Sequence, residues 1–484
     1  MKKSVALTLT LILSAFHIAC GGRGANGPTA IGNFSDASLK GQYTYHLIGT
    51  DLATGADFSE AGVFTADGAE HITSGIDDFN EAGIQNFGIP LTGTYQINSD
   101  GTGTLMLTRT ILQQQTFTTL AVSLIDASTL YIVGADTSAN SSGRADLQDS
   151  SAFSAPSGSY SFTLHTRRPT SVGAIGDMTL ASGSVSSGSE DQNVGGVTSA
   201  QTLTGGAFDP PDNTGRGTGT LIDDTPATMR FIYYVIDAST IRIFPIDASV
   251  IGIGHAEKQT GNFTDASLTG NFAFGTRGET TVGAVRTVGR FTSDGFGNLS
   301  AGAFDSARDD GTLSATFNTG TYTPMAANGR TVLTFNASTG NVTEILRMVS
   351  PARAFVLVSD PTKVEDGTLD AQTVGAFATS TLTGQYSFFM DGFDATSLLD
   401  RVGTVQWDGS GKLHLAQIVN RHGNVVPAPE PLSGTYSITG DGRVVASVSG
   451  LSSNLILYLV SGSEGYMLQG DPDTEVDGRM KLQQ

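Results

Sequence analysis

The sequence predicts an all-β protein made of four antiparallel β-barrel-like domains in tandem, each with about eight strands. The stretch IGNFSDASLKGQYTY at residues 31–45 returns almost unchanged as TGNFTDASLTGNFAF at residues 260–274. Asp-Gly and Asn-Gly pairs stand between runs of alternating apolar and polar residues, which is the pattern of β-hairpins. Long stretches rich in Leu, Ala, Glu and Lys are missing, and this composition favours strands over helices.

The repeated stretch sets the length of one domain. Shorter forms of it occur as SAFSAPSGSYSF from residue 151 and as VGAFATSTLTGQYSF from residue 374. The glycine before each aromatic strand marks the register, and successive copies lie 117, 112 and 114 residues apart: Gly41, Gly158, Gly270 and Gly384. A period of this length indicates repeated whole domains rather than solenoid units or propeller blades. The predicted repeats are residues 34–150, 151–260, 261–375 and 376–484.

Eight strands are predicted in the first repeat. Turn residues that tolerate a positive φ separate them, as in Asn-Ser-Asp-Gly at residues 98–101. The predicted strands are residues 42–50, 58–66, 70–77, 89–98, 103–110, 115–125, 129–135 and 143–149. Short connections make neighbouring strands antiparallel, so the repeat can close as an up-and-down barrel without free edges. Four immunoglobulin-like β-sandwiches are the alternative, because a sandwich accommodates the same strands.

Three repeats open with glycine, any residue and an aromatic residue: Gly41-Gln42-Tyr43, Gly270-Asn271-Phe272 and Gly384-Gln385-Tyr386. This motif resembles the Gly-x-Trp start of lipocalin-type barrels, and the resemblance implies a barrel of about eight strands. The whole chain also resembles bacterial surface lipoproteins with tandem Gly/Thr-rich β repeats. A single outer-membrane barrel is disfavoured, because aromatic residues make up 8% of the chain and Trp407 is the sole tryptophan.

The first 20 residues have the features of an export signal. Two lysines precede an apolar run at residues 5–16, which is too short for a comfortable membrane span, and Cys20 follows as the only cysteine. Its position resembles the signal of bacterial lipoproteins. The resemblance implies a signal peptide at residues 1–19, acylation of Cys20 and anchoring at the outer membrane or cell surface. Residues 20–33 are then a flexible tether. A cleaved signal and secretion are the alternative.

The charge of the chain argues against nucleic-acid binding. The net charge is −20 with only 26 lysines and arginines, and no basic cluster stands ready to neutralise phosphates. Contact with a membrane is therefore expected only through the lipid anchor. The adjacent acids Asp77-Asp78 and Asp309-Asp310 are interpreted as parts of solvated loops.

The acidic turn DPDTEVDG at residues 471–478 is the one candidate metal site. Asp473, Glu475 and Asp477 alternate as the oxygen ligands of a calcium loop do in its first half. The bidentate glutamate of such a loop is missing at the expected distance, and the related turn at residues 360–367 shares only Asp-Pro and Asp-Gly. The pattern therefore also fits ordinary turn chemistry, and the prediction is that the protein holds no metal.

No catalytic motif stands out. The histidines lack zinc-binding spacings, and the serines that stand between glycines precede no helical pattern. The sequence therefore predicts no catalytic residue, no cofactor and no enzymatic activity.

A phenylalanine seven residues before the repeat glycine is a candidate structural joint in three repeats: Phe34, Phe263 and Phe377. We predict that this side chain caps an open end of the barrel that follows and fixes the linker to it. In the second repeat Phe153 stands only five residues before Gly158, which predicts a different joint.

These observations favour a non-enzymatic, exported cell-envelope lipoprotein whose β modules mediate binding or structural and adhesive contacts. One alternative is a binder that holds a small molecule inside its barrels. The other is a secreted enzyme that acts on polysaccharide. An envelope protein, a glycan and a small hydrophobic ligand are the partners considered.

Overall fold

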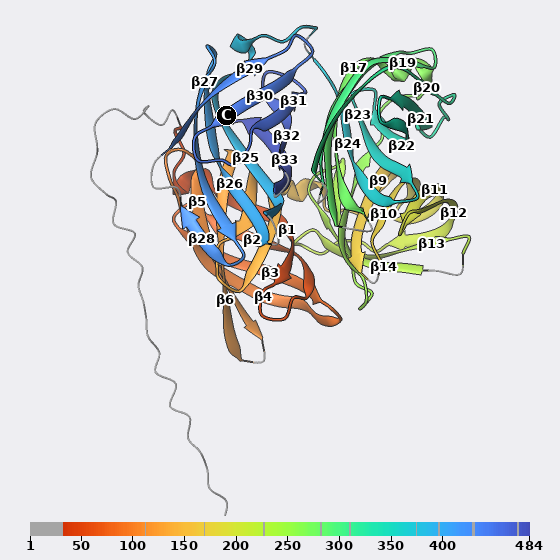
Figure 1. Cartoon of the computed structure of the whole chain (residues 1–484). Helices are drawn as coiled ribbons and strands as arrows, with labels where there is room; N and C mark the ends of the chain where they lie inside the picture. The colour runs from red at the N-terminus through yellow and green to blue at the C-terminus, as the bar shows by residue number, and fades with distance from the viewer. Residues whose placement is uncertain are drawn as a thin grey trace, which may run out of the picture. The chain divides into compact units, whose positions relative to one another are not determined.

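The computed structural model describes residues 32–111, 113–168, 170–225, 228–280, 283–308, 311–373, 375–394, 397–427, 431–471 and 474–484. Strands and short turns make up almost all of these residues (Figure 1). The helical elements within them are four 3₁₀ turns: η1 (Asp36–Ser38), η2 (Ser150–Ala152), η3 (Asp265–Ser267) and η4 (Thr379–Thr381). No helix in these ranges has the length and apolar character needed to cross a membrane.

The first repeat forms a closed barrel of eight antiparallel strands, red to orange in Figure 1. The strands are β1 (Lys40–Asp51), β2 (Asp57–Asp67), β3 (His71–Glu81), β4 (Ile84–Ile97), β5 (Thr102–Ile111), β6 (Gln114–Asp126), β7 (Thr129–Gly134) and β8 (Ala139–Leu147). Each strand pairs with the next, and β1 closes the barrel by pairing with β8 from Tyr43 opposite Leu147 to Asp51 opposite Ala139.

The second and third repeats form closed barrels with the same strand order. Barrel 2 contains β9 (Gly158–Arg168), β10 (Val172–Ala181), β11 (Ser184–Val194), β12 (Val197–Phe208), β13 (Arg216–Asp223), β14 (Thr228–Val235), β15 (Thr240–Pro245) and β16 (Ile251–Lys258). Barrel 3 contains β17 (Thr269–Thr280), β18 (Ala284–Asp294), β19 (Asn298–Arg308), β20 (Gly311–Tyr322), β21 (Arg330–Ala337), β22 (Gly340–Ser350), β23 (Arg353–Asp360) and β24 (Lys363–Ala371).

The fourth barrel differs only in a divided strand. It contains β25 (Thr383–Asp394), β26 (Ser397–Asp408), β27 (Lys412–Arg421), β28 (Asn424–Pro427), β29 (Leu432–Ile438), β30 (Arg443–Val448), β31 (Leu455–Leu459), β32 (Glu464–Asp471) and β33 (Thr474–Leu482). Both β28 and β29 pair with β27, so together they take the place of the long strand β4 in barrel 1. The predicted all-β class with four closed antiparallel barrels is confirmed, and the sandwich alternative is wrong.

Large apolar side chains fill the barrels. Alternate residues of β1 point inward, and Tyr43 stacks on Phe64 of β2 with 5.3 Å between ring centroids. The other barrels have equivalent clusters of buried aromatic and aliphatic residues. Each of these clusters draws its residues from one barrel, so each barrel has a core of its own. Full burial of one such side chain contributes about 1.5–3 kcal/mol.

A phenylalanine at the start of each repeat packs beside the glycine of the turn between the fourth and fifth strands. An added Cβ at Gly101 would lie 3.0 Å from the ring of Phe34. The same neighbours in the other repeats are Phe153 and Gly215, Phe263 and Gly329, and Phe377 and Gly442. Phe263 and Phe377 are buried, whereas Phe34 and Phe153 are half-buried. Their role in fixing the linkers stays a prediction.

The joint of the second repeat shares this contact but differs in its local structure. The 3₁₀ turn η2 precedes Phe153, whereas in the other repeats the 3₁₀ turn follows the phenylalanine. The shorter spacing between Phe153 and Gly158 thus accompanies a change in the order of turn and aromatic residue.

A glutamine at the end of each repeat reaches across to the next barrel. Its side-chain Nε2 donates to two backbone carbonyls of the next barrel. One belongs to the residue before the turn glycine, and the other to a residue near the end of the sixth strand. The pairs are Gln148 with Thr214 (3.2 Å) and Val235 (2.6 Å), Gln259 with Asn328 and Met348 (both 2.9 Å), and Gln372 with Asp441 (3.2 Å) and Leu459 (2.7 Å).

The fourth repeat makes the same contact with barrel 1, which is not its neighbour in the chain. Gln483 Nε2 donates to the carbonyls of Asp100 (2.9 Å) and Leu124 (2.7 Å). The backbone N–H of Gln484 donates to Ile125 O (3.0 Å), as Asp149 N–H donates to Ile236 O in the first linker. The contacts between barrels therefore form a closed cycle, 1 to 2 to 3 to 4 and back to 1.

Apolar packing follows the same cycle. The sixth and seventh strands of each barrel cover outward-facing residues on the first three strands of the preceding barrel. Tyr234 and Phe244 of barrel 2 pack on Ala61 of barrel 1, and Tyr131 of barrel 1 packs on Val402 of barrel 4. Equivalent clusters join barrels 2 and 3 and barrels 3 and 4. Each interface is thus heterologous, using one face of a barrel and a different face of its neighbour.

Bidentate ion pairs mark three of the four interfaces. The arginine after the turn glycine binds a buried aspartate of the preceding barrel at 2.7–3.1 Å: Arg216 with Asp78, Arg330 with Asp191, and Arg443 with Asp305. Asp77 is buried as well and binds Arg109 at 2.6 Å inside barrel 1. The interpretation of Asp77 and Asp78 as a solvated loop is therefore wrong, while Asp309 and Asp310 lie outside the described residues.

The interface between barrels 4 and 1 has no such pair at the corresponding described positions. Thr102 follows the turn glycine in barrel 1, and Ile418 takes the place of the aspartate in barrel 4. Ile418 packs in the apolar cluster with Val402 and Tyr131. Replacement of a buried ion pair by packed apolar groups is often neutral in stability, so this interface needs no ion pair to hold.

Candidate functional site

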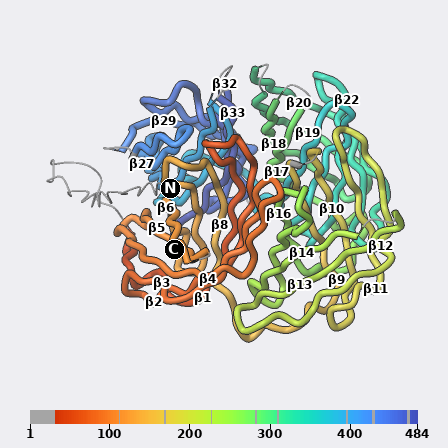
Figure 2. Tube along the Cα trace, turned by 90° about the horizontal axis from the view of Figure 1, so that it is seen from below, coloured from red at the N-terminus to blue at the C-terminus, as the bar shows by residue number. Residues whose placement is uncertain are grey.

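The first and last strands of the four barrels surround a cavity of about 1220 Å³. Its walls come mainly from β1 and β8, β9 and β16, β17 and β24, and β25 and β33, which can be followed by colour in Figure 2. Side chains alternate between the two faces of a strand. The residues that face out of each barrel therefore line the cavity, for example His46 between the inward-facing Tyr45 and Leu47.

Basic residues are concentrated along this cavity. The described lining includes Lys481 and seven arginines, out of 26 lysines and arginines in the chain: Arg144, Arg167, Arg242, Arg277, Arg286, Arg353 and Arg479. Carboxylates accompany them: Asp57, Asp146, Asp237, Glu257, Glu279, Asp366, Asp370, Glu464 and Asp477. The cavity is therefore close to charge balance, in a protein whose net charge is −20.

One network joins barrel 3 to barrel 4. Arg277 of β17 donates to Asp391 (2.8 Å) and Asp477 (3.0 Å), and Arg286 of β18 lies 2.8 Å from the other oxygen of Asp477. Burial opposes ionisation of Asp391, but Arg277, Arg286 and Arg167 together outweigh burial and lower the pKa of that carboxyl. Burial raises the pKa of Asp477. The network thus supplies complementary charge across the interface.

A second network connects barrels 2, 3 and 4. Arg353 of β23 binds Glu257 of barrel 2 (2.9 Å) and Asp370 of its own barrel (2.8 Å). Arg479 of β33 binds the same Asp370 (2.5 Å) and lies 4.1 Å from the ring centroid of Tyr466. Burial works against ionisation of Asp370, but Arg479 and Arg353 outweigh it and lower the pKa of that carboxyl.

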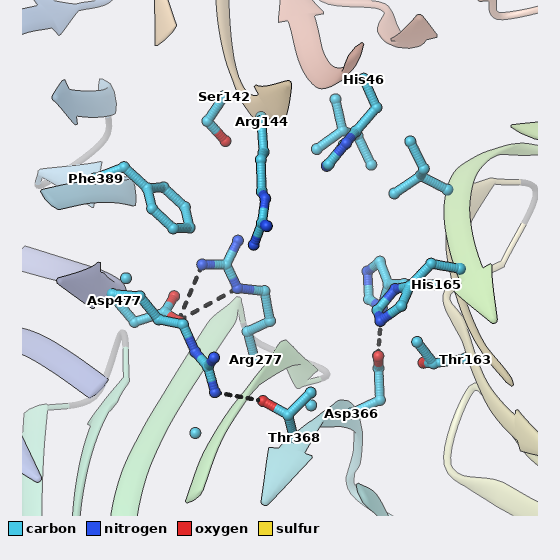
Figure 3. Close-up of a pocket in the computed structure, with 18 of the residues that line it drawn as sticks. His46, Ser142, Arg144, Thr163, His165, Arg277, Asp366, Thr368, Phe389 and Asp477 are labelled. Atoms are coloured by element: carbon cyan, nitrogen blue, oxygen red, sulfur yellow. Dashed lines mark hydrogen bonds and ion pairs between the residues drawn. The ribbon is translucent and has the colours of Figure 1, made fainter. Parts of the chain in front are cut away.

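Barrels 1 and 2 meet at a shared carboxylate. Asp146 of β8 accepts from Arg144 of the same strand (2.8 Å) and from Arg242 of barrel 2 (2.7 Å). His165 of barrel 2 lies 2.6 Å from Asp366 of barrel 3 (Figure 3). Every barrel therefore contributes at least one charged side chain to a contact with another barrel around the cavity.

Several polar groups remain open to the cavity. Figure 3 shows Arg144 and Arg277 extending toward one another from barrels 1 and 3. Their side chains are 39% and 31% exposed, so part of each guanidinium is free to meet a ligand. Aromatic surface comes from the half-buried Phe389, which packs on the buried Tyr131 with 4.6 Å between ring centroids at the cavity wall. The cavity thus offers donors, acceptors and aromatic faces together.

The residues predicted from the sequence lie mostly elsewhere. Cys20 and Asp473 are outside the described residues. Glu475 and Asp477 lie within β33 and not in a loop, and Asp477 lines the cavity, where two arginines bind it. Among the described residues no group of three or more His, Cys, Asp and Glu side chains is placed to hold a metal ion.

The arginines of the cavity were not predicted. Apart from Arg167, which adjoins Arg168, they occur singly along the chain, so no larger basic cluster appears in the sequence. The available signal was their position, since Arg144, Arg277 and Arg479 occupy outward-facing positions on the first or last strand of a repeat.

The fold and the cavity define the class of this protein: a closed cycle of four up-and-down β-barrels around one shared polar cavity. No family model and no curated protein sequence matches the chain. Among solved structures, a double mutant of transferrin-binding protein B, a vaccine antigen from Haemophilus parasuis, aligns with 73% of this chain and 82% of its own at 11% identity. Its TM-score is 0.17, so this likeness carries no argument about fold or function.

Proposed function

We propose that the protein is an exported, non-enzymatic lipoprotein of the cell envelope that binds a saccharide in the cavity shared by its four barrels. The observation that carries this proposal is the cavity of about 1220 Å³, to which all four barrels contribute polar side chains. Large concave sites lined by converging polar groups and aromatic surface are typical ligand sites.

The chemistry of the lining favours a saccharide over an ion. Arg277, Arg353 and Arg479 are already paired with carboxylates, so a strongly charged ligand would have to displace these partners. Sugar hydroxyls both donate and accept, which suits a lining that mixes guanidinium donors with carboxylate acceptors. The half-buried ring of Phe389 supplies aromatic surface for the apolar side of a sugar ring.

Titration of the purified protein with envelope oligosaccharides, followed by calorimetry and ligand-observed NMR, tests this function. Arg144→Gln removes a cavity donor whose ion pair lies within its own strand, so the contacts between barrels change little. Arg230→Gln is the matched control, because Arg230 is an exposed arginine outside the described cavity lining that pairs with Asp247 at 2.8 Å.

The expected result is saccharide binding that weakens about tenfold in Arg144→Gln and is unchanged in Arg230→Gln. Equal effects of the two substitutions, or no binding by any oligosaccharide, would overturn the proposal. Analysis of the recovered sugar separates binding from hydrolysis, and shortened products would favour a polysaccharide-acting enzyme.

A further inference from the structure

Barrel 3 has an internal cavity of about 170 Å³, separate from the one between the barrels. It lies at the end of the barrel opposite Phe263, because Phe263 packs at the turn before β21 whereas the cavity is lined at the turns after β21 and β23. Aromatic side chains form one wall: Phe274, Phe304, Phe317 and Phe335. The charged groups of the lining are Glu344, Glu365, Asp360, Lys363 and Arg308.

Glu344 is an unusual residue for the place that it occupies. In each barrel one backbone amide of the sixth strand donates to the carbonyl of the turn glycine between the fourth and fifth strands. The residue four positions before this amide is an apolar core residue in the other three barrels: Leu120, Phe231 and Leu455. Barrel 3 has Glu344 there, with 3% of the residue exposed. Its Oε2 has no hydrogen-bond partner in the described part of the chain. A buried carboxylate oxygen without a partner costs free energy, so the residue calls for a ligand.

The neighbouring charges do not neutralise Glu344. Lys363 Nζ binds Glu365 Oε2 at 2.6 Å, and Thr276 donates to the other oxygen of Glu365 at 2.6 Å. This ion pair is complete in itself, so Lys363 is not available as an ion-pair partner for Glu344. Burial, followed by the charge of Glu365, raises the pKa of Glu344 to about 8.

In barrel 1 the corresponding end of the interior is filled by an arginine of the barrel itself. Arg109 lies eight residues after the turn glycine Gly101 and binds Glu60 and Asp77 inside the barrel. The residue eight positions after the turn glycine of barrel 3 is Ala337, which leaves the volume and the positive charge of that arginine unfilled. Barrel 3 therefore has no cation at the position where barrel 1 places Arg109.

We propose that the interior of barrel 3 binds a small organic ammonium ligand, whose cationic nitrogen pairs with Glu344 and whose apolar part packs on the phenylalanine wall. The phenylalanine faces add cation–π attraction to the ion pair. The cavity has room for a small molecule of a few non-hydrogen atoms. This site is independent of the saccharide site proposed above.

Calorimetric titration of the whole protein with n-butylammonium tests the proposal, and n-pentanol serves as the uncharged probe of similar shape. We expect saturable binding of the amine and none of the alcohol. Glu344→Gln keeps the shape of the side chain and should weaken amine binding by about 30-fold or more, because the buried charge pair is lost.

Glu344→Leu separates a ligand-binding role from a structural one. Leucine stands at this position in barrels 1 and 4, so the variant should melt at a higher temperature than the wild type and should not bind the amine. Equal affinity for amine and alcohol, no amine binding by the wild type, or unchanged amine binding in Glu344→Leu would each overturn the proposal. Arg144→Gln should bind the amine as the wild type does, so failure at the saccharide site is distinguishable from failure here.

Discussion

Replacement of Gln483 by alanine should loosen the contact between barrels 4 and 1 without disturbing either barrel. The substitution removes two hydrogen bonds, to the carbonyls of Asp100 and Leu124. A typical hydrogen bond contributes about 1 kcal/mol net, so the contact should lose about 2 kcal/mol. The open fraction at this contact should then rise about 30-fold.

Hydrogen exchange measured by mass spectrometry reports this opening directly. The backbone amide of Gln484 donates to Ile125 O, so it is protected only while barrels 4 and 1 are in contact. Exchange should quicken in the C-terminal peptide that contains Gln484 and stay unchanged in the core of barrel 2.

Gln372→Ala is the matched control, since it removes the same two bonds between barrels 3 and 4. The chain joins barrels 3 and 4 directly and keeps their effective concentration high, so a smaller rise in exchange is expected there. If Gln483→Ala leaves the exchange of the peptide that contains Gln484 at the wild-type rate, the closed cycle of contacts contributes no stability and our reasoning is refuted.

Four further predictions follow from the same contacts and from the sequence. A circular permutant that joins Gln484 to Gly32 through a short linker and starts at Gly261 should keep the wild-type melting temperature, and loss of cooperative unfolding would contradict the cyclic arrangement. Burial, followed by the charge of Asp391, raises the pKa of Asp400 in the folded protein to about 7. The folded state therefore loses stability relative to the unfolded chain as the pH rises from about 4 to 7. Asp400→Asn should melt at a higher temperature than the wild type at pH 8 and at the same temperature at pH 4. Arg443→Met should destabilise the protein by about 3 kcal/mol in urea titrations because Asp305 stays buried, whereas Arg443→Thr with Asp305→Ile, which copies Thr102 and Ile418, should recover most of that loss. Labelled palmitate should be incorporated into the wild type and not into Cys20→Ala, and equal labelling would disprove lipidation at Cys20.

Turn chemistry explains why most strands could be predicted. Gly101 has a φ of 84°, which favours glycine, and the strands that flank its turn were predicted within one residue at that end. The third and fourth strands were predicted too short. Ala82 and Gly83 make a two-residue turn with positive φ at both positions, but an Ala-Gly pair is a weak turn signal. Asp77 and Asp78, in the second half of β3, make that part of the strand too polar to be recognised from the sequence.

The acids of β3 are polar because of partners that no sequence pattern indicates. Asp78 meets Arg216, which lies 138 residues away in the chain, and Asp77 meets Arg109 across the barrel interior. The glutamine that ends each repeat was visible in the sequence, but its function depends on two carbonyls of a different barrel. Contacts between domains of this kind require the packing of whole barrels, so periodicity and turn residues cannot predict them.

The heterologous contacts between barrels have a consequence for the number of repeats. Four steps bring the last barrel onto the first, so every docking face within residues 32–484 is used. A chain shortened to three repeats would keep one free face of each kind at its two ends, and those faces would join separate molecules head to tail. Loss of one repeat should therefore convert a self-contained molecule into a growing oligomer, and the repeat number itself protects the protein against polymerisation.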